Sequence, residues 1–146
     1  MPNVAERAGL NLTKRHAATM GTAEKLQSLL HDLDDSLPSQ IEGSLIASGD
    51  GFLVGHTLGE IEDAERVAAM VATTVGVSRR MADTLSAGAV KETSISAENR
   101  IVQLYLVGDQ GALAVVAEEG ANVALINLKA REQVEAAKRL LTGALA

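Results

Sequence analysis

The 146-residue sequence contains no cysteine and no tryptophan, and Phe52 and Tyr105 are its only phenylalanine and tyrosine. Without cysteine, disulfides, thiolate metal ligands and cysteine nucleophiles are excluded. Two aromatic rings are too few for a stacking platform, which weighs against single-stranded nucleic acid as a ligand. The core must therefore be built from Leu, Val, Ile, Ala and Met.

Long hydrophobic runs and an excess of positive charge are also missing. The longest apolar-leaning stretch, residues 67–77, is too short to span a bilayer and is interrupted by Thr and Gly. The N-terminus lacks the apolar segment of a signal peptide. The net charge of −6 repels phosphate backbones. We therefore expect a soluble, cytoplasmic protein that neither binds nucleic acid nor inserts into a membrane.

No residue pattern indicates a chemical site. The three histidines, His16, His31 and His56, lack the spacing of a metal-binding pair, and we interpret them as unconnected and solvent-facing. The carboxylates at residues 32–35 lack the glycine and terminal glutamate of a calcium loop. The glycines of segment 49–55 join two strands rather than open a helix, which excludes a phosphate loop. We expect no catalytic residue, no metal site and no cofactor.

Hydrophobic periodicity predicts one domain of eight elements, at residues 22–146, behind a flexible N-terminal segment, residues 1–21. Leucines from Leu26 to Leu37 recur at steps of three and four, which predicts an amphipathic helix that ends at Pro38. The other predicted elements are strands at 41–47 and 52–57, a helix at 61–85, strands at 89–96, 100–107 and 112–117, and a helix at 123–141 capped by Asn122.

The predicted helix at 61–85 carries two apolar or small-residue stripes. The first stripe consists of Ala64, Val67, Ala68, Val71, Val75, Ala82 and Leu85, and the second of Met70, Thr73, Thr74, Val77 and Met81. A helix with this pattern is buried on more than one side. In a chain of this size, we expect a partner to cover the second stripe.

The strand patterns predict the order of the sheet and its covering. The strands at 100–107 and 112–117 are apolar on both faces, which is typical of central strands covered by helices on both sides. The strand at 89–96 is more polar and suits an edge. Short hairpin loops imply antiparallel pairing. Three helices must then cover two faces of one sheet, giving a three-layer α+β sandwich of order αββαβββα.

This element order, with the hairpin at residues 41–54 and its Ser48-Gly49-Asp50-Gly51 turn, resembles the roadblock / dynein-light-chain family over residues 22–141. The hairpin at residues 100–117, around its Gly108–Gly111 turn, is similar to the last hairpin of that family. The resemblance implies a profilin-like, five-stranded antiparallel sheet, with the long helix on one face and two helices on the other.

The resemblance also implies a function. Two copies join through the third strand and the central helix, and bacterial and archaeal members often pair with a small Ras-like GTPase. We therefore predict a non-enzymatic homodimeric interaction module that binds and regulates such a GTPase as activator or scaffold. The predicted interface residues are Met70, Thr73, Thr74, Val77, Arg80, Met81, Thr93 and Ile95.

Two alternatives stay open at this point. The first is a small-molecule-binding sensory domain, with Thr73, Thr74, Gln103 and Tyr105 as the polar groups of a pocket between the sheet and the long helix. The second concerns Arg79 and Arg80, which either flank a partner groove or offset the helix dipole.

Overall fold

The computed structural model describes residues 21–145, so the predicted flexible segment lies, apart from Gly21, outside the described residues. The elements follow the predicted order. They are a helix over residues 21–36, β1 (Ile41–Ser48), β2 (Leu53–His56), α2 (Ile61–Thr84), β3 (Thr93–Ser96), β4 (Arg100–Val107), β5 (Gly111–Glu118) and α3 (Val123–Leu145). The α+β fold class and the element order are confirmed.

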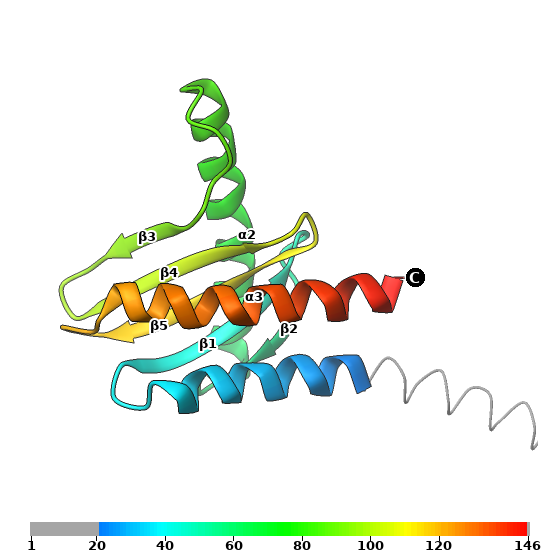
Figure 1. Ribbon diagram of the computed structural model, residues 1–146, viewed down its shortest axis with the longest axis vertical. Coiled ribbons are helices and arrows are strands. Elements are labelled where there is room, and N and C mark those ends of the chain that lie inside the picture. Colours follow the sequence, from blue (N-terminus) through cyan, green and yellow to red (C-terminus); the bar gives the residue numbers. More distant parts are fainter. Residues whose placement is uncertain (1–20, 146) are drawn as a thin grey trace, which may run out of the picture.

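The five strands form one antiparallel sheet in the order β2-β1-β5-β4-β3. The helix at 21–36 and α3 lie side by side over one face, and α2 crosses the other, so the chain builds the predicted three layers (Figure 1). The strand β3 is at an edge, as its polar sequence predicted. The strand β5 is at the centre, as its two apolar faces predicted.

The two-helix face holds the larger core. The leucine stripe of the first helix is buried, with Leu30 and Leu33 fully inaccessible, and Ile126 and Ala130 of α3 meet the same face. Each buried leucine contributes roughly 1.5–3 kcal/mol through removal of apolar surface from water. The helix ends before Pro38, and Asn122 caps α3 by accepting a hydrogen bond from the Leu125 N–H at 3.1 Å, both as predicted.

A tight turn joins β1 and β2. In the β1–β2 turn, Gly51 has φ +89°, a conformation that favours glycine, and its N–H donates to the Ser48 carbonyl at 2.9 Å. A Cβ at Gly51 would also lie 3.3 Å from the Ala69 backbone of α2. The turn therefore packs directly against the helix that crosses this face.

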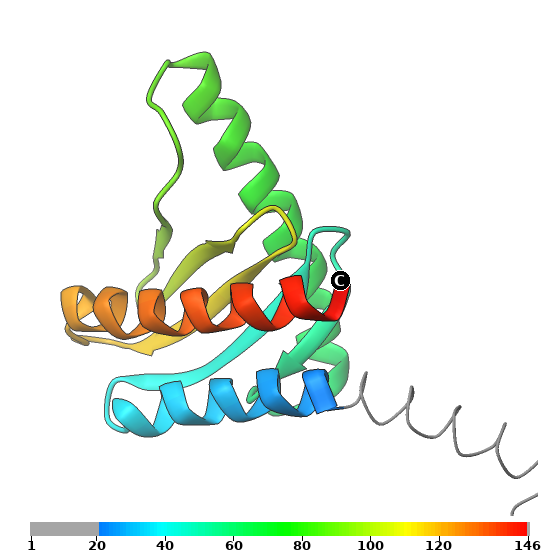
Figure 2. The same ribbon diagram turned by 45° about the vertical axis from the view of Figure 1, so that its right-hand side comes forward.

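The helix α2 is longer than the sheet beneath it. Its first half is packed on the sheet through Ala64, Ala68 and Val71, whereas no residue from 72 to 84 is buried. The second half projects past the β3 edge, and the chain returns to the sheet through a long connecting segment (Figure 2). Leu85, the last residue of the first apolar stripe, is 71% exposed, because the helix has already left the sheet there.

The projection also shortens the third strand. The sequence predicted a strand at 89–96, but β3 begins at Thr93. Residues 85–92 descend from the projecting helix end, with Ser86 at φ 52° and Gly88 at φ +87°, and meet β4 only at the Thr93–Leu104 pair. Four predicted strand residues thus form no ladder with β4.

Candidate partner-binding surface

The outer edge of β3 is open. The Ala97 N–H donates to the Arg100 carbonyl, which fixes the hydrogen-bonding phase of the β3–β4 ladder. Because hydrogen-bonded pairs alternate along an antiparallel ladder, Thr93 and Ile95 direct their backbone groups to β4. Ser94 and Ser96 direct their backbone groups outward. Within residues 21–145, no other group bonds this outward backbone. An open edge of this kind is a template for a further strand.

Beside this edge, α2 presents an exposed apolar stripe. Met70 is 63% exposed, Val77 41% and Met81 58%. At 100° per residue, these three side chains and Thr74 share one flank of the helix. The opposite flank of α2 contacts the β4–β5 turn through Arg79. Because β3 runs away from that turn (Figure 1), the exposed stripe lies on the β3 side of the sheet.

The structure brings six of the eight predicted interface residues to this region and separates two. Met70, Thr74, Val77 and Met81 form the stripe, and Thr93 and Ile95 lie on the same sheet face, paired with Leu104 and Val102. Thr73 and Arg80 lie on the side of α2 that points away from the sheet. Their predicted part in an interface stays a prediction.

Most side-chain hydroxyls of α2 donate hydrogen bonds to backbone carbonyls of α2 itself. Thr73 donates to the Ala69 carbonyl at 3.1 Å and Thr74 to the Met70 carbonyl at 2.8 Å. One hydroxyl reaches further, because the Thr93 side chain donates to the Ser78 Oγ at 3.0 Å and ties β3 to α2. The first residue of β3 is thereby fixed to the middle of the projecting helix.

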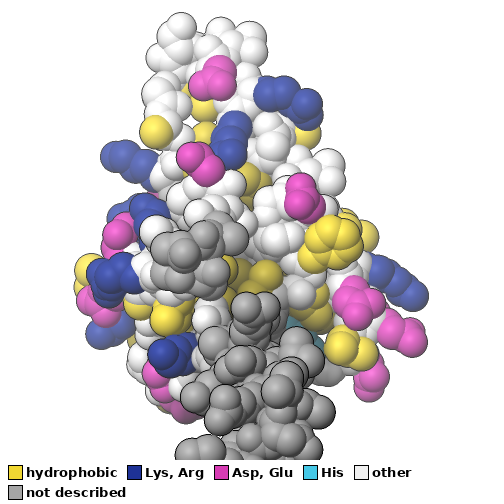
Figure 3. Space-filling model, turned by 90° about the vertical axis from the view of Figure 1, so that its right-hand side faces the viewer, with side chains coloured by type: hydrophobic (Ala, Val, Ile, Leu, Met, Phe, Trp, Pro, Cys, Tyr) yellow, Lys and Arg dark blue, Asp and Glu magenta, His cyan; other side chains and the backbone are white. Residues whose placement is uncertain are grey.

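Arg79 is neither free nor placed to offset the dipole. The last turn of α2 carries no basic residue, and dipole effects fade beyond the terminal turn. Arg79 instead donates from Nη2 to the Gly108 carbonyl at 3.2 Å and lies 3.7 Å from the Asp109 carboxylate. It connects the projecting helix to the β4–β5 turn. Charged side chains of both signs are scattered over the projecting part among uncharged and apolar surface (Figure 3).

The polar groups of the suggested small-molecule pocket do not converge. Gln103 and Tyr105 are buried on the face beneath α3, where both side chains donate to the Asn127 Oδ1. Burial raises the pKa of the Tyr105 hydroxyl to about 12. Thr73 and Thr74 belong to the helix on the other face. The structure therefore gives this group of residues no common cavity.

A contact that the sequence did not indicate closes the other sheet edge. The Gln27 amide donates to the His56 carbonyl at 2.6 Å and accepts from the His56 N–H at 3.0 Å. His31 also contacts Gln27, with 3.2 Å between the Nε2 atoms, whereas Gln27 bonds the backbone of His56 and not its ring. The ring of His56 has its Nδ1 buried, so this histidine is not fully solvent-facing as interpreted. Gly55 was the available signal, because a glycine inside a strand often marks a close approach. A Cβ there would lie 2.9 Å from the Gln27 Oε1.

The described part of the chain contains neither a cluster of metal ligands nor a membrane-spanning helix. Between residues 21 and 145, no three His, Cys, Asp or Glu side chains gather as metal ligands. Over the same residues, every helix is either too short or too polar to cross a membrane.

Comparison with known proteins gives one family and one fold. A family model described as Roadblock/LC7 domain matches residues 26–117. A Roadblock/LC7 domain from Streptomyces avermitilis is 18% identical with a TM-score of 0.74, covering 80% of this chain and 97% of that one. Myxococcus xanthus MglB is 12% identical with a TM-score of 0.74, covering 84% and 91%. The gliding protein MglB from Thermus thermophilus is 18% identical with a TM-score of 0.69, covering 82% and 90%. No curated protein matches the chain.

Proposed function

Because this chain belongs to the Roadblock/LC7 domain family, we propose that it is a non-enzymatic homodimer that binds and regulates a small Ras-like GTPase. The observation that carries the proposal is the exposed stripe of Met70, Val77 and Met81 beside the open β3 edge. Monomeric proteins rarely leave a contiguous apolar surface next to a free strand edge without a use for it.

The geometry of this region favours self-association. A second copy placed with its β3 antiparallel to the first would satisfy the outward backbone of Ser94 and Ser96 in both chains. The same twofold rotation would bring the two α2 stripes together and cover Ile95, which is 44% exposed. One patch that meets itself is an isologous contact, which closes at two copies.

The GTPase part of the proposal rests on the family. The resemblance implies that bacterial and archaeal members pair with Ras-like GTPases, and the structural neighbours include MglB proteins, one of them a gliding protein. The expected mechanism is recognition. The dimer presents a composite surface and favours whichever nucleotide state of the GTPase fits it better. We assign no arginine a part in phosphoryl transfer, because the proposed mechanism is recognition alone.

The test uses the full chain and Ras-like GTPases encoded in the same genome. Each GTPase is loaded with GDP or with a non-hydrolysable GTP analogue and mixed with the protein before gel filtration. We expect a complex with at least one GTPase in one nucleotide state, and no GTP turnover by the protein alone. Failure to form a complex with any of them in either state would remove the GTPase proposal, while a dimer in sedimentation would preserve the assembly proposal.

A further inference from the structure

Three adjoining hollows form one trough beneath the projecting half of α2. Each of them is lined by Arg79, Leu106 and Asp109. The largest, about 360 Å³, extends to α3 and to the segment before β3, and a second of about 250 Å³ lies inside the bend at residues 88–90. The trough is therefore elongated along the underside of the projecting helix.

The trough exists because β3 begins late. β3 pairs with β4 only as far as Leu104, and the backbone groups of even-numbered β4 residues point toward β3. Leu106 is the next residue in that series, and neither its N–H nor its C=O has a partner within residues 21–145. The floor of the trough thus holds a short length of unpaired strand edge.

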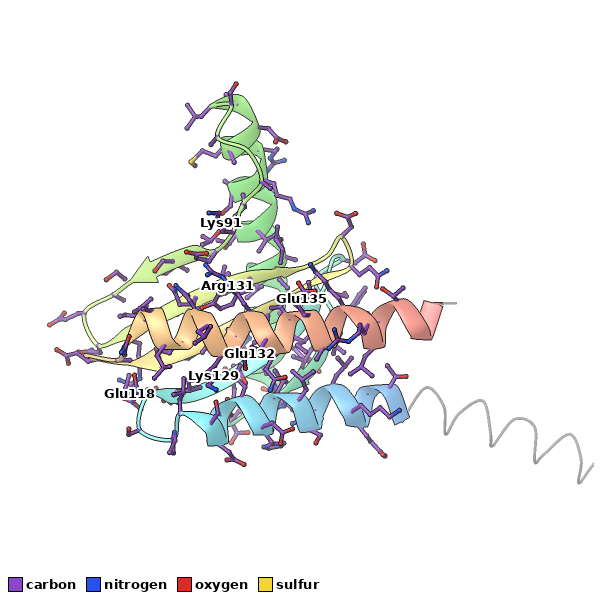
Figure 4. All side chains as sticks on the ribbon, viewed as in Figure 1. Lys91, Glu118, Lys129, Arg131, Glu132 and Glu135 are labelled. Carbon is purple, nitrogen blue, oxygen red and sulfur yellow. The ribbon has the colours of Figure 1, made fainter. Side chains whose placement is uncertain are left out.

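Positive charge exceeds negative charge around this edge. The largest hollow is lined by the carboxylates of Asp109 and Glu135 and by four cationic side chains, Arg79, Lys91, Arg131 and Lys138. These are four of the ten Lys and Arg residues in the described part of the chain, which also carries eighteen Asp and Glu. Figure 4 shows Lys91, Arg131 and Glu135 on the side of α3 toward β3, and Lys129 and Glu132 on its other side. Val90, Leu106 and Val134 supply apolar lining between the charges.

The existing partners of these cations are easily exchanged. Lys138 Nζ lies 3.1 Å from the Glu135 carboxylate, with both side chains well exposed, and Arg131 Nη2 lies 2.6 Å from that of Glu92. Exposed ion pairs contribute only about 0–1 kcal/mol. Lys91 has no carboxylate partner within residues 21–145. A carboxylate brought by another molecule can therefore compete for these groups.

We propose that this trough docks an extended acidic segment of a partner protein, whose backbone pairs with Leu106 and whose carboxylates meet Arg79, Lys91 and Lys138. An elongated trough with a free strand edge fits a peptide in β-conformation better than a compact anion. The apolar lining takes the side chains that alternate with the acidic ones. The net positive charge of the largest hollow, on an otherwise acidic domain, favours an acidic sequence.

The trough and the apolar stripe are separate surfaces. Arg79 lies about 160° around the α2 axis from Val77, since the two residues are two positions apart. A second copy seated on the stripe therefore leaves the Arg79 flank open. The docking proposal does not depend on the dimer, and each can fail alone.

The probe is an end-blocked heptapeptide of alternating glutamate and valine, titrated into the full chain and followed by amide NMR shifts and hydrogen exchange. We expect shifts at Lys91, Leu106 and Asp109 and slower exchange of the Leu106 amide. Binding should weaken as salt rises, because surface charges are screened. The counterpart with lysine in place of glutamate should leave these amides unchanged.

Two matched variants distinguish the effect of a charge in the trough from the effect of the same charge elsewhere on α3. Lys138→Glu and Lys129→Glu each reverse an α3 lysine that pairs with a glutamate three residues away. Lys138→Glu should weaken peptide binding roughly three- to tenfold, the effect of reversing one exposed charge. Lys129→Glu, on the other side of α3, should change it less than twofold.

Three results would overturn the proposal. The first is the absence of any shift at millimolar peptide. The second is shifts confined to Ser94 and Ser96, which would place the peptide on the β3 edge. The third is a Leu106 amide that is already protected in the free protein and loses its protection on dilution, which would show that a second copy fills the trough.

Discussion

At the β2 edge of the sheet, the Gln27 side chain bonds the outward N–H and C=O of His56, as a neighbouring strand would. At the β3 edge, the outward backbone of Ser94 and Ser96 meets no group of the described chain. Both strands are four residues long, so length does not distinguish them. The chain has closed the β2 edge with one of its own side chains, whereas the β3 edge stays open.

The helix α2 extends this contrast across the whole face. Its first half lies over the β2 side, where Ala64, Ala68 and Val71 are buried. Its second half passes the β3 side, where Val77 and Met81 are exposed. One continuous helix is thus core on one side of the domain and surface on the other. The β2 side holds the buried part of the helix, and the β3 side combines an exposed apolar stripe with a free strand edge.

The largest expected effect is on the β2 side. Ala68→Asp places an unpaired carboxylate at a site with 0% exposure between α2 and the sheet. The free energy of unfolding should fall by about 3–5 kcal/mol, the cost of an uncompensated buried charge. Urea denaturation followed by circular dichroism measures this change.

The neighbouring Ala69 is exposed and offers the matched control. Ala69→Asp adds the same charge one residue further along the same helix, and it should cost less than about 1 kcal/mol, as is usual at surface positions. Equal losses in the two variants would contradict the assignment of this half of α2 to the core.

The sequence predicted the fold well because periodicity reports which faces are apolar. The leucine stripe of the first helix, the central position of β5, the edge position of β3 and the Asn122 cap all follow from local pattern. What the pattern does not contain is how far the sheet reaches under a helix. Val71 and Val75 are the same residue type in the same stripe, yet only Val71 is buried, because Val75 packs at the margin of the core beneath α2.

Because local patterns do not report how distant segments meet, they also missed the late start of β3 and the Gln27 contact at the β2 edge. The predicted strand at 89–96 has uniform strand character, and its first four residues lose their ladder only because α2 carries the chain away from β4. Gln27 and His56 are 29 residues apart, and no local rule connects them. The trough around Leu106 arises from the late start of β3 and was therefore not predictable from residue patterns.

The second-largest effect is expected on the β3 side, in the dissociation of the proposed dimer. Val77→Glu, or Met70→Glu, should leave the unfolding of the single chain nearly unchanged, because both sites are exposed there. In the proposed dimer, the charge would be buried without a partner, and dissociation should become easier by about 3 kcal/mol. Sedimentation equilibrium at micromolar concentration measures the dimer constant.

Leu128 provides the comparison for these variants. It is 56% exposed on α3, on the opposite face of the sheet, close to the exposure of Met70 and Met81. Leu128→Glu makes the same chemical change away from the stripe and should preserve the dimer. Dimers that persist in Val77→Glu and Met70→Glu would show that the contact lies elsewhere.

The smallest effect is expected from opening the closed edge. Gln27→Ala removes both hydrogen bonds to His56, and solvent can replace them, so unfolding should become easier by only about 1–2 kcal/mol. The His56 amide should exchange faster with solvent, while the amides of β5 keep their protection. Ser28→Ala, at an exposed position of the same helix, should alter neither quantity.

Gln27→Glu makes the comparison of the edges sharper, because a carboxylate still accepts from the His56 N–H but cannot donate to its C=O. Its effect on stability should lie between those of wild type and Gln27→Ala. With the β2 edge open, a chain has two free edges, and strand pairing between unlike edges no longer closes at two copies. Gln27→Ala should therefore add concentration-dependent species larger than a dimer in sedimentation velocity. If His56 exchange and the size distribution both stay as in wild type, the Gln27 contact does not protect this edge, and the asymmetry of the sheet must come from strand shape alone.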